Sequence, residues 1–200
     1  FIASVFLGIA FSFKLQTIFI VPFVSYYLLL KYKSIKKIFA YGIISALVFW
    51  SSGIIAFIYG RELLAPLKIY AVQSITYQRM YLNFSSFWAI FGHYTSNYSI
   101  FSIIAIVLTI LLCLLICYHL YRVYESAPQC FLGGGDFYLY SVCFIWTIVL
   151  FLPSMHDRYA YLLDILLVVL ACIKCEIAYY TISCVSVSIC SYILYFNEYT

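Results

Sequence analysis

Long apolar runs separated by short polar segments dominate this chain of 200 residues. A helix that crosses a membrane needs about 20 consecutive, mostly apolar residues. The pattern therefore predicts an all-α fold, a polytopic transmembrane helical bundle with about six spans in a single transmembrane domain. The expected spans cover residues 1–30, 38–59, 100–118, 137–152, 161–173 and 177–196.

The polar segments predict an orientation. Lysines crowd the segment 31–37, and the positive-inside rule places such a basic loop in the cytoplasm. Counting spans from there puts residues 60–98 outside as an extracytoplasmic loop, residues 119–136 inside, residues 155–161 outside and Lys174 inside. Most of the basic residues then face the cytoplasm, which is the expected bias.

Composition supports a membrane protein. The chain is 66% hydrophobic and 9% charged, whereas a soluble domain carries about 25% charged residues. The net charge of +4 is scattered and forms no long basic stripe, so we expect no nucleic-acid partner. The chain begins within an apolar run and without Met, so we expect it to be the C-terminal part of a longer chain.

Cysteine and histidine give no strong metal signal. Most of the eight cysteines lie in apolar runs, where Cys behaves as a small hydrophobic residue. Cys172 and Cys175 have CxxC spacing, but no second pair and no His lies nearby in the sequence. We therefore assign no metal ligands.

The most informative polar cluster falls between two apolar runs, directly after Pro153. Charged groups at a membrane boundary are costly and often functional. A helix beginning here would place Asp157, Tyr161 and Asp164 on one face, at positions i, i+4 and i+7. This stripe suits binding of a polar or phosphorylated ligand, and the alternative is a helix start anchored among lipid headgroups. The cluster contains His156, Asp157, Arg158, Tyr159, Tyr161 and Asp164.

A second polar pair, Lys14 and Gln16, interrupts the first apolar run. The topology places this pair at the outer end of residues 1–13, on the same side as residues 155–161. We interpret Lys14 as a contact for phosphate or another anion, and the alternative is a lysine whose ammonium group reaches the membrane surface.

The long outer loop is rich in aromatic residues. These residues are typical of a helix lying at the membrane interface, or of a platform that binds carbohydrate, and aromatic belts are common in membrane proteins of every function. They include Tyr70, Tyr77, Tyr81, Trp88 and Tyr94.

Two segments resemble a known family. Residues 8–22, with Lys14, Gln16 and Pro22, look like a segment of bacterial GT-C class membrane glycosyltransferases related to the second mannosyltransferase of GPI-anchor synthesis. Residues 152–164 resemble the signature of that family, which reads roughly Pro-x-Met-His-Glu-Arg-Tyr-x-Tyr-x-x-Asp. Asp157 departs from the usual Glu, and Leu162 stands where Pro is common.

The resemblance implies transfer of a sugar, mannose by analogy, from a polyprenyl-phosphate sugar donor to a lipid or glycan acceptor at the outer face of the bacterial plasma membrane. It also implies that the catalytic acidic residue lies upstream, in an N-terminal outer loop, and it leaves the use of a divalent cation open. The implied substrate-binding residues are Lys14, Gln16, His156, Asp157, Arg158, Tyr159, Tyr161 and Asp164.

Two other functions remain open at this point. A transporter or flippase of lipid-linked sugars would use the same charges along a substrate path. A non-catalytic subunit of a membrane assembly would need no catalytic acid. The sequence shows no internal repeat, which weighs against a transporter.

Overall fold

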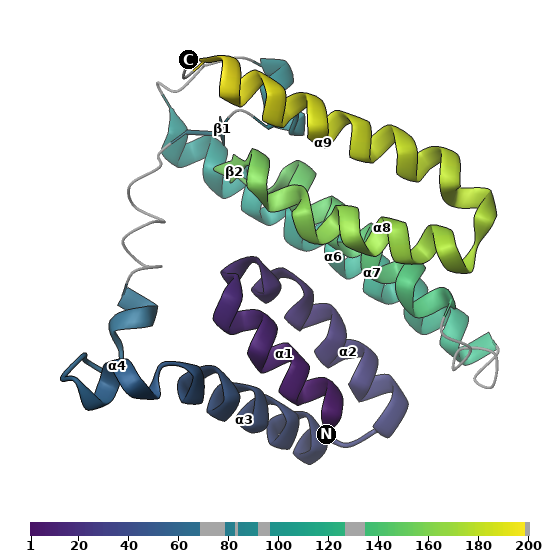
Figure 1. Cartoon of the computed structure of the whole chain (residues 1–200). Helices are drawn as coiled ribbons and strands as arrows, with labels where there is room; N and C mark the ends of the chain where they lie inside the picture. The colour runs from purple at the N-terminus through teal and green to yellow at the C-terminus, as the bar shows by residue number, and fades with distance from the viewer. Residues whose placement is uncertain (69–78, 83, 92–96, 127–134, 199–200) are drawn as a thin grey trace. The chain divides into compact units, whose positions relative to one another are not determined.

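The computed structural model describes residues 1–68, 79–82, 84–91, 97–126 and 135–198 (Figure 1). Nearly all of these residues are helical, which confirms the all-α prediction. The chain folds as two compact units, Phe1–Gln78 and Arg79–Thr200. Each unit is described separately below.

The Phe1–Gln78 unit is a set of helices broken where the sequence turns polar. The predicted interruption at Lys14 is confirmed: Lys14 is extended, with φ −151° and ψ 121°. A proline at the start of the third helical segment fits because its missing N–H has no helical partner there. The elements are α1 (Ile2–Phe13), the 3-10 helix η1 (Leu15–Ile20), α2 (Val21–Tyr32), α3 (Ile35–Ser52) and α4 (Ile54–Ile58).

Small residues bring α1 and α3 into close contact. Ser4 and Gly8 lie one helical turn apart on α1, and both are buried. A Cβ atom built on Gly8 would lie 2.5 Å from the Ser45 carbonyl oxygen of α3. The Ser45 hydroxyl also donates a hydrogen bond of 2.8 Å to the Ser4 carbonyl. This close approach of two backbones is typical of helix pairs in membranes, where small residues form the interface.

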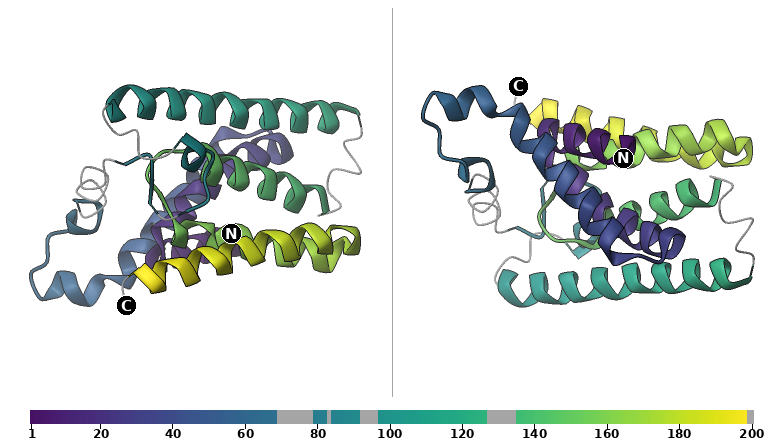
Figure 2. Two further views of the ribbon diagram at one scale, coloured as in Figure 1. Left: turned by 90° about the horizontal axis from the view of Figure 1, so that it is seen from above. Right: turned by 90° about the horizontal axis from the view of Figure 1, so that it is seen from below.

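The Arg79–Thr200 unit is built from four long helices that pack in chain order. Each of α6, α7 and α8 contacts the helix that follows it, and the helices run alongside one another (Figures 1 and 2). The elements are β1 (Tyr81–Leu82), the 3-10 helix η2 (Phe87–Phe91), α6 (Tyr98–Ser126), α7 (Gly135–Phe151), β2 (Met155–His156), the 3-10 helix η4 (Asp157–Ala160), α8 (Tyr161–Ile173), the 3-10 helix η5 (Cys175–Ile177) and α9 (Ala178–Glu198).

The core of this unit lies around α7 and α8. On α7, Ser141, Ile145 and Val149 are fully buried at helical spacing. On α8, Leu163, Leu167 and Leu170 follow the same spacing and are at most 4% exposed. One stripe of each helix therefore faces its neighbours.

Three helices of the described residues are long and apolar enough to cross a membrane: Ile35–Ser52, Tyr98–Ser126 and Cys175–Ile193. Only 17% of the most apolar window of Tyr98–Ser126 is buried, so most of its apolar side chains lie on the surface of the unit. Such a surface is stable against lipid rather than water. The remaining predicted spans correspond to shorter helices, such as α7 with 17 residues and α8 with 13.

Polar contacts mark one end of this bundle. Lys174, after α8, forms an ion pair of 3.5 Å with Asp136, at the start of α7. His119 Nδ1 and the Tyr140 hydroxyl lie 2.6 Å apart, joining α6 to α7 near the same end. The predicted topology places Lys174 and residues 119–136 on one side of the membrane, and the structure pairs Lys174 with Asp136 at one end of the bundle.

Candidate functional site

The candidate site is the connection between α7 and α8, at the opposite end of the bundle. The helix α7 ends at Phe151, two residues before Pro153. Ser154 then adopts a left-handed conformation with φ 59°, which turns the chain sharply. Met155 and His156 form the short strand β2, and a 3-10 turn precedes α8.

This conformation corrects the predicted helix. The α-helix begins at Tyr161 rather than after Pro153, and Asp157 belongs to the 3-10 turn. A 3-10 helix has three residues per turn, so the backbone from Asp157 to Ala160 does not continue the α-helix that carries Tyr161 and Asp164. The prediction that one continuous α-helix carries all three residues is therefore wrong. The reason is that the turn is held by residues far away in the sequence.

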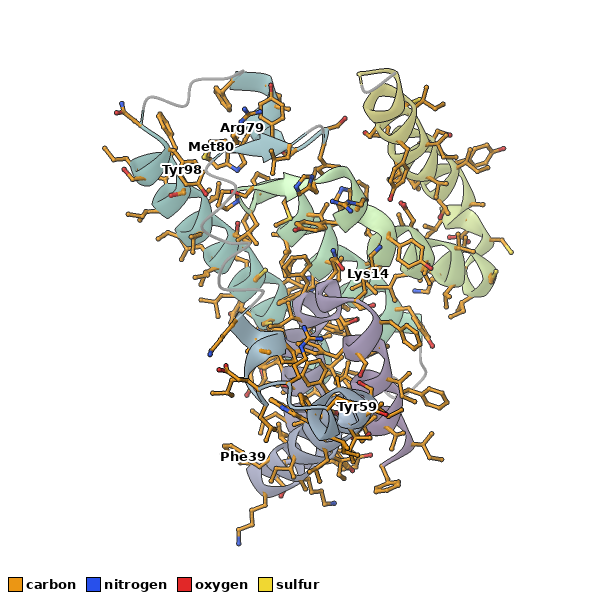
Figure 3. The ribbon with its side chains drawn as sticks, turned by 60° about the vertical axis from the view of Figure 1, so that its left-hand side comes forward. Lys14, Phe39, Tyr59, Arg79, Met80 and Tyr98 are labelled. Atoms are coloured by element: carbon orange, nitrogen blue, oxygen red, sulfur yellow. The ribbon has the colours of Figure 1, made fainter. Side chains whose placement is uncertain are left out.

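Ser154 joins three segments of the chain. Its amide donates to the Met80 carbonyl at 3.0 Å. Its hydroxyl donates to the Arg79 carbonyl at 2.9 Å and lies 2.8 Å from the Tyr98 hydroxyl at the start of α6. Because a serine hydroxyl has one proton, the Tyr98 hydroxyl is the donor in the second contact. Arg79, Met80 and Tyr98 lie close together in Figure 3.

The strands β1 and β2 extend this junction. They pair in parallel, with Tyr81 opposite Met155 and Leu82 opposite His156. The pairing fixes the register of the segment that carries His156, because a slip by one residue would turn every side chain to the other face.

Trp88, in η2, joins the same region to the end of α7. Its indole N–H donates a hydrogen bond of 2.7 Å to the carbonyl of Phe151, the last residue of α7. Helix-end carbonyls lack partners within the helix, so this bond satisfies one of them. Trp88 is 8% exposed and packs in a cluster with Met80, Ala105, Phe87 and Tyr98.

Trp88 is thus a buried contact with α6 and α7 rather than part of an exposed platform, whereas Phe91 in the same loop is 54% exposed. Tyr70, Tyr77 and Tyr94 lie outside the described residues. We name the set formed by Arg79, Met80, Trp88, Tyr98 and Ser154 the junction clamp. Sequence reasoning missed its role, because no local pattern relates residues 79–98 to residues 151–156.

The turn next to the clamp carries the predicted site residues between two buried anchors. Met155 and Ala160 are 3% and 1% exposed and hold the turn against the bundle. His156 is half-buried, and its ring packs edge-on against Tyr159 at a centroid distance of 5.7 Å. Arg158 is exposed. The turn therefore combines a partly buried imidazole with a solvent-facing guanidinium group two residues away.

Tyr161 and Asp164 lie in the first turn of α8 and differ in exposure and in contacts. Tyr161 is 52% exposed. Asp164 accepts a hydrogen bond of 3.0 Å from the hydroxyl of Ser188 on α9. Its carboxylate therefore contributes to the contact between α8 and α9. Of Asp157, only its backbone position in η4 is described.

Lys14 and Gln16 belong to the Phe1–Gln78 unit, whereas the other candidate residues belong to the Arg79–Thr200 unit. Both lie at the break between α1 and α2 and are partly buried. The Gln16 side-chain carbonyl oxygen is buried and has no hydrogen-bond partner among the residues that the structure describes. An unsatisfied buried acceptor is unfavourable, so this site favours a donor supplied from outside the unit's described residues.

No three His, Cys, Asp or Glu side chains come together as a metal site within the described ranges. No protein-family model matches the sequence, and no curated protein or solved structure matches it significantly. Function is therefore inferred from the chemistry of the candidate residues.

Proposed function

We propose that the protein is a membrane glycosyltransferase of the GT-C class. It transfers a sugar, with mannose as the first to test, from a polyprenyl-phosphate donor to a lipid or glycan acceptor. Transfer takes place at the outer face of the cell membrane, which we take to be a bacterial plasma membrane. The observation that carries the proposal is the ordered turn at the end of α7, which displays Arg158 and His156 between apolar helices.

An arginine suits the departing phosphate. As the bond between sugar and phosphate breaks, negative charge develops on the phosphate that leaves with the lipid. A guanidinium group stays charged and offers forked N–H donors that match phosphate oxygens. The junction clamp and the β1–β2 pairing hold the backbone that leads to the exposed Arg158, which favours a guanidinium group positioned before the donor binds.

The neighbouring residues fit the sugar end of the same ligand. His156 and Tyr159 lie edge-on to each other, and Tyr161 is exposed at the start of α8. In the proposal, His156 donates to a phosphate or sugar oxygen, and the two tyrosines line the sugar pocket. Asp157 binds a sugar hydroxyl or orients Arg158.

Lys14 and Gln16 are the proposed donor contacts in the Phe1–Gln78 unit. Lys14 supplies a point charge for the phosphate, and Gln16 fixes the donor by its amide group. The buried oxygen of Gln16 supports this role, because a donor hydroxyl would satisfy it. Asp164 is the remaining proposed donor contact, and its Oδ1 already accepts a hydrogen bond from the Ser188 hydroxyl.

The test is glycosyl transfer by the full-length protein in nanodiscs. A panel of polyprenyl-phosphate sugars is offered in Mg²⁺ and again in EDTA, which also reports whether a divalent cation is used. We expect Arg158→Ala to lower kcat by a factor on the order of 100 or more, the effect of removing one group that stabilises transition-state charge. Arg122→Ala, at an exposed arginine near the other end of α6, is the matched control.

Two results would contradict the proposal. Equal activity of the Arg158 and Arg122 variants would remove the phosphate role from Arg158. A folded protein that transfers no sugar from any donor would reject the glycosyltransferase itself. Uptake of a labelled sugar lipid into vesicles would then test the transporter alternative.

A further inference from the structure

The connection between α2 and α3 concentrates positive charge at a helix boundary. Residues 31–37 carry four exposed lysines and no acidic residue. We name this segment the basic hairpin. Its lysines are Lys31, Lys33, Lys36 and Lys37.

The backbone of the basic hairpin is tight. Helix α2 ends at Tyr32 and α3 begins at Ile35, so two residues connect them. Lys33 adopts a left-handed conformation with φ 48°, and its amide donates to the Leu29 carbonyl at 2.8 Å. A left-handed residue that closes a helix in this way turns the chain within one position.

The turn gathers ammonium groups around one ring. Lys37 Nζ lies 4.8 Å from the centroid of the Tyr32 ring, and Lys31 Nζ lies 5.8 Å from it. Both distances fall within the range of cation–π attraction. Lysines from the two helices are therefore held together on one exposed tyrosine, which is 37% exposed.

This arrangement is electrostatically unfavourable without an anion. Lys36 and Lys37 lie in the first turn of α3, where the helix dipole disfavours cations. Ser34 precedes α3 and makes no side-chain cap hydrogen bond, so the dipole is not offset there. In residues 1–78 the sequence has a single acidic side chain, Glu62, and Lys68 contacts it.

The surroundings of the basic hairpin are those of a membrane boundary. Helix α3 is one of the candidate spans, and the hairpin lies directly before it. Ile35 and Phe39, on the first turns of α3, are 62% and 69% exposed (Phe39 is labelled in Figure 3). Exposed apolar side chains beside lysines fit the layer where acyl chains meet headgroups.

We propose that the basic hairpin binds the phosphate groups of anionic phospholipids in the cytoplasmic leaflet. Lys31 and Lys37 contact a headgroup over the Tyr32 ring, and Lys36 and the first-turn amides of α3 add positive potential to the same place. Clusters of four or more lysines beside a membrane helix bind anionic lipid in this manner. The proposal is independent of sugar transfer.

The experiment measures which lipids the full-length protein retains. The protein is reconstituted in nanodiscs of phosphatidylcholine and phosphatidylglycerol in equal amounts, and spin-labelled forms of both lipids report the selectivity at its surface. We expect phosphatidylglycerol to be enriched, and the enrichment to fall with salt because the lysines are exposed. Replacing all four lysines by Gln should reduce the enrichment roughly tenfold or more.

Three further variants sharpen the test. Arg61→Gln with Lys68→Gln removes two charges elsewhere in the same unit and should leave the enrichment unchanged. Lys36→Gln with Lys37→Gln should give an intermediate loss, and it covers the case in which the fourfold variant fails to fold. Tyr32→Leu keeps every charge and should weaken the enrichment by removing the ring that gathers the ammonium groups.

Two outcomes would overturn the proposal. If the folded fourfold or double variant keeps the wild-type preference for phosphatidylglycerol, the basic hairpin is not the lipid site. If inorganic phosphate displaces the spin-labelled lipid when chloride of equal ionic strength does not, the site belongs to soluble phosphate.

Discussion

The α1–α3 contact and the junction clamp solve the same problem by different means. At Gly8, two helix backbones meet because a side chain is missing. At Ser154, non-helical segments meet because hydroxyl, amide and indole groups join them. The first contact depends on shape and tolerates no added atoms, whereas the second depends on polar partners and on one left-handed residue. Static packing suits a scaffold, and a polar junction suits a segment that must present charged groups in a fixed position.

The largest expected effect is at the indole of the junction clamp. Trp88→Ala removes a buried ring and leaves the Phe151 carbonyl without its partner, so we expect a loss of about 3–5 kcal/mol in the free energy of unfolding. Trp50→Ala is the control, because Trp50 also donates to a backbone carbonyl, that of Leu63, but through an exposed hydrogen bond. Titration with SDS in mixed micelles measures both. A similar loss in the two variants would show that Trp88 is not a structural anchor.

A smaller effect is expected at the α1–α3 contact. Gly8→Ala would place a methyl group 2.5 Å from the Ser45 carbonyl oxygen and 2.8 Å from Val48 Cβ, so the helices must separate. We expect a loss of about 1–3 kcal/mol in the same SDS titration. The same change at Gly42, where no described residue lies within 4 Å of the added atom, should stabilise the helix by up to about 1 kcal/mol. Equal behaviour of the two alanines would contradict the close packing.

The smallest expected effect is the difference in stability between two substitutions of Ser154. Ser154→Ala and Ser154→Gly both remove the hydroxyl, and each should cost about 1–3 kcal/mol because Arg79 and Tyr98 lose a partner. Glycine accepts φ 59° without steric strain, so the Gly variant should be more stable than the Ala variant by about 1–2 kcal/mol. Unfolding in SDS gives the order, and an Ala variant as stable as the Gly variant would mean that the turn relaxes.

The sequence predicted well what depends on local periodicity. The apolar runs gave the positions of α3, α6, α7, α8 and α9, since a helix satisfies its own backbone and needs only a continuous apolar stretch. Lys14 and Gln16 marked the break between α1 and α2, because polar residues within an apolar run oppose a continuous span. Helix lengths were less predictable, and fewer helices reach spanning length than the runs suggested.

The junction clamp could not be predicted in this way. The strands β1 and β2 have two residues each, too few to show an alternation, and they lie over seventy residues apart. Nothing local marks Ser154 as left-handed or Trp88 as the partner of Phe151. The helix predicted through Asp157 failed for the same reason, because contacts distant in sequence determine the turn that carries it. The sequence identified His156 and Arg158 as candidates, whereas the turn that carries them could not be predicted from it.

The clamp also orders the steps of biosynthesis. The hydrogen bond from Ser154 to Arg79 joins residues 75 positions apart, and the one from Trp88 to Phe151 spans 63. A ribosome releases Arg79 and Trp88 well before their partners exist, because α6 and α7 lie between them in the sequence, and closing a loop of this length has an entropic cost. The turn bearing Arg158 is thus completed late, after both helices have been synthesised, so a nascent chain that ends before Ser154 lacks the clamp.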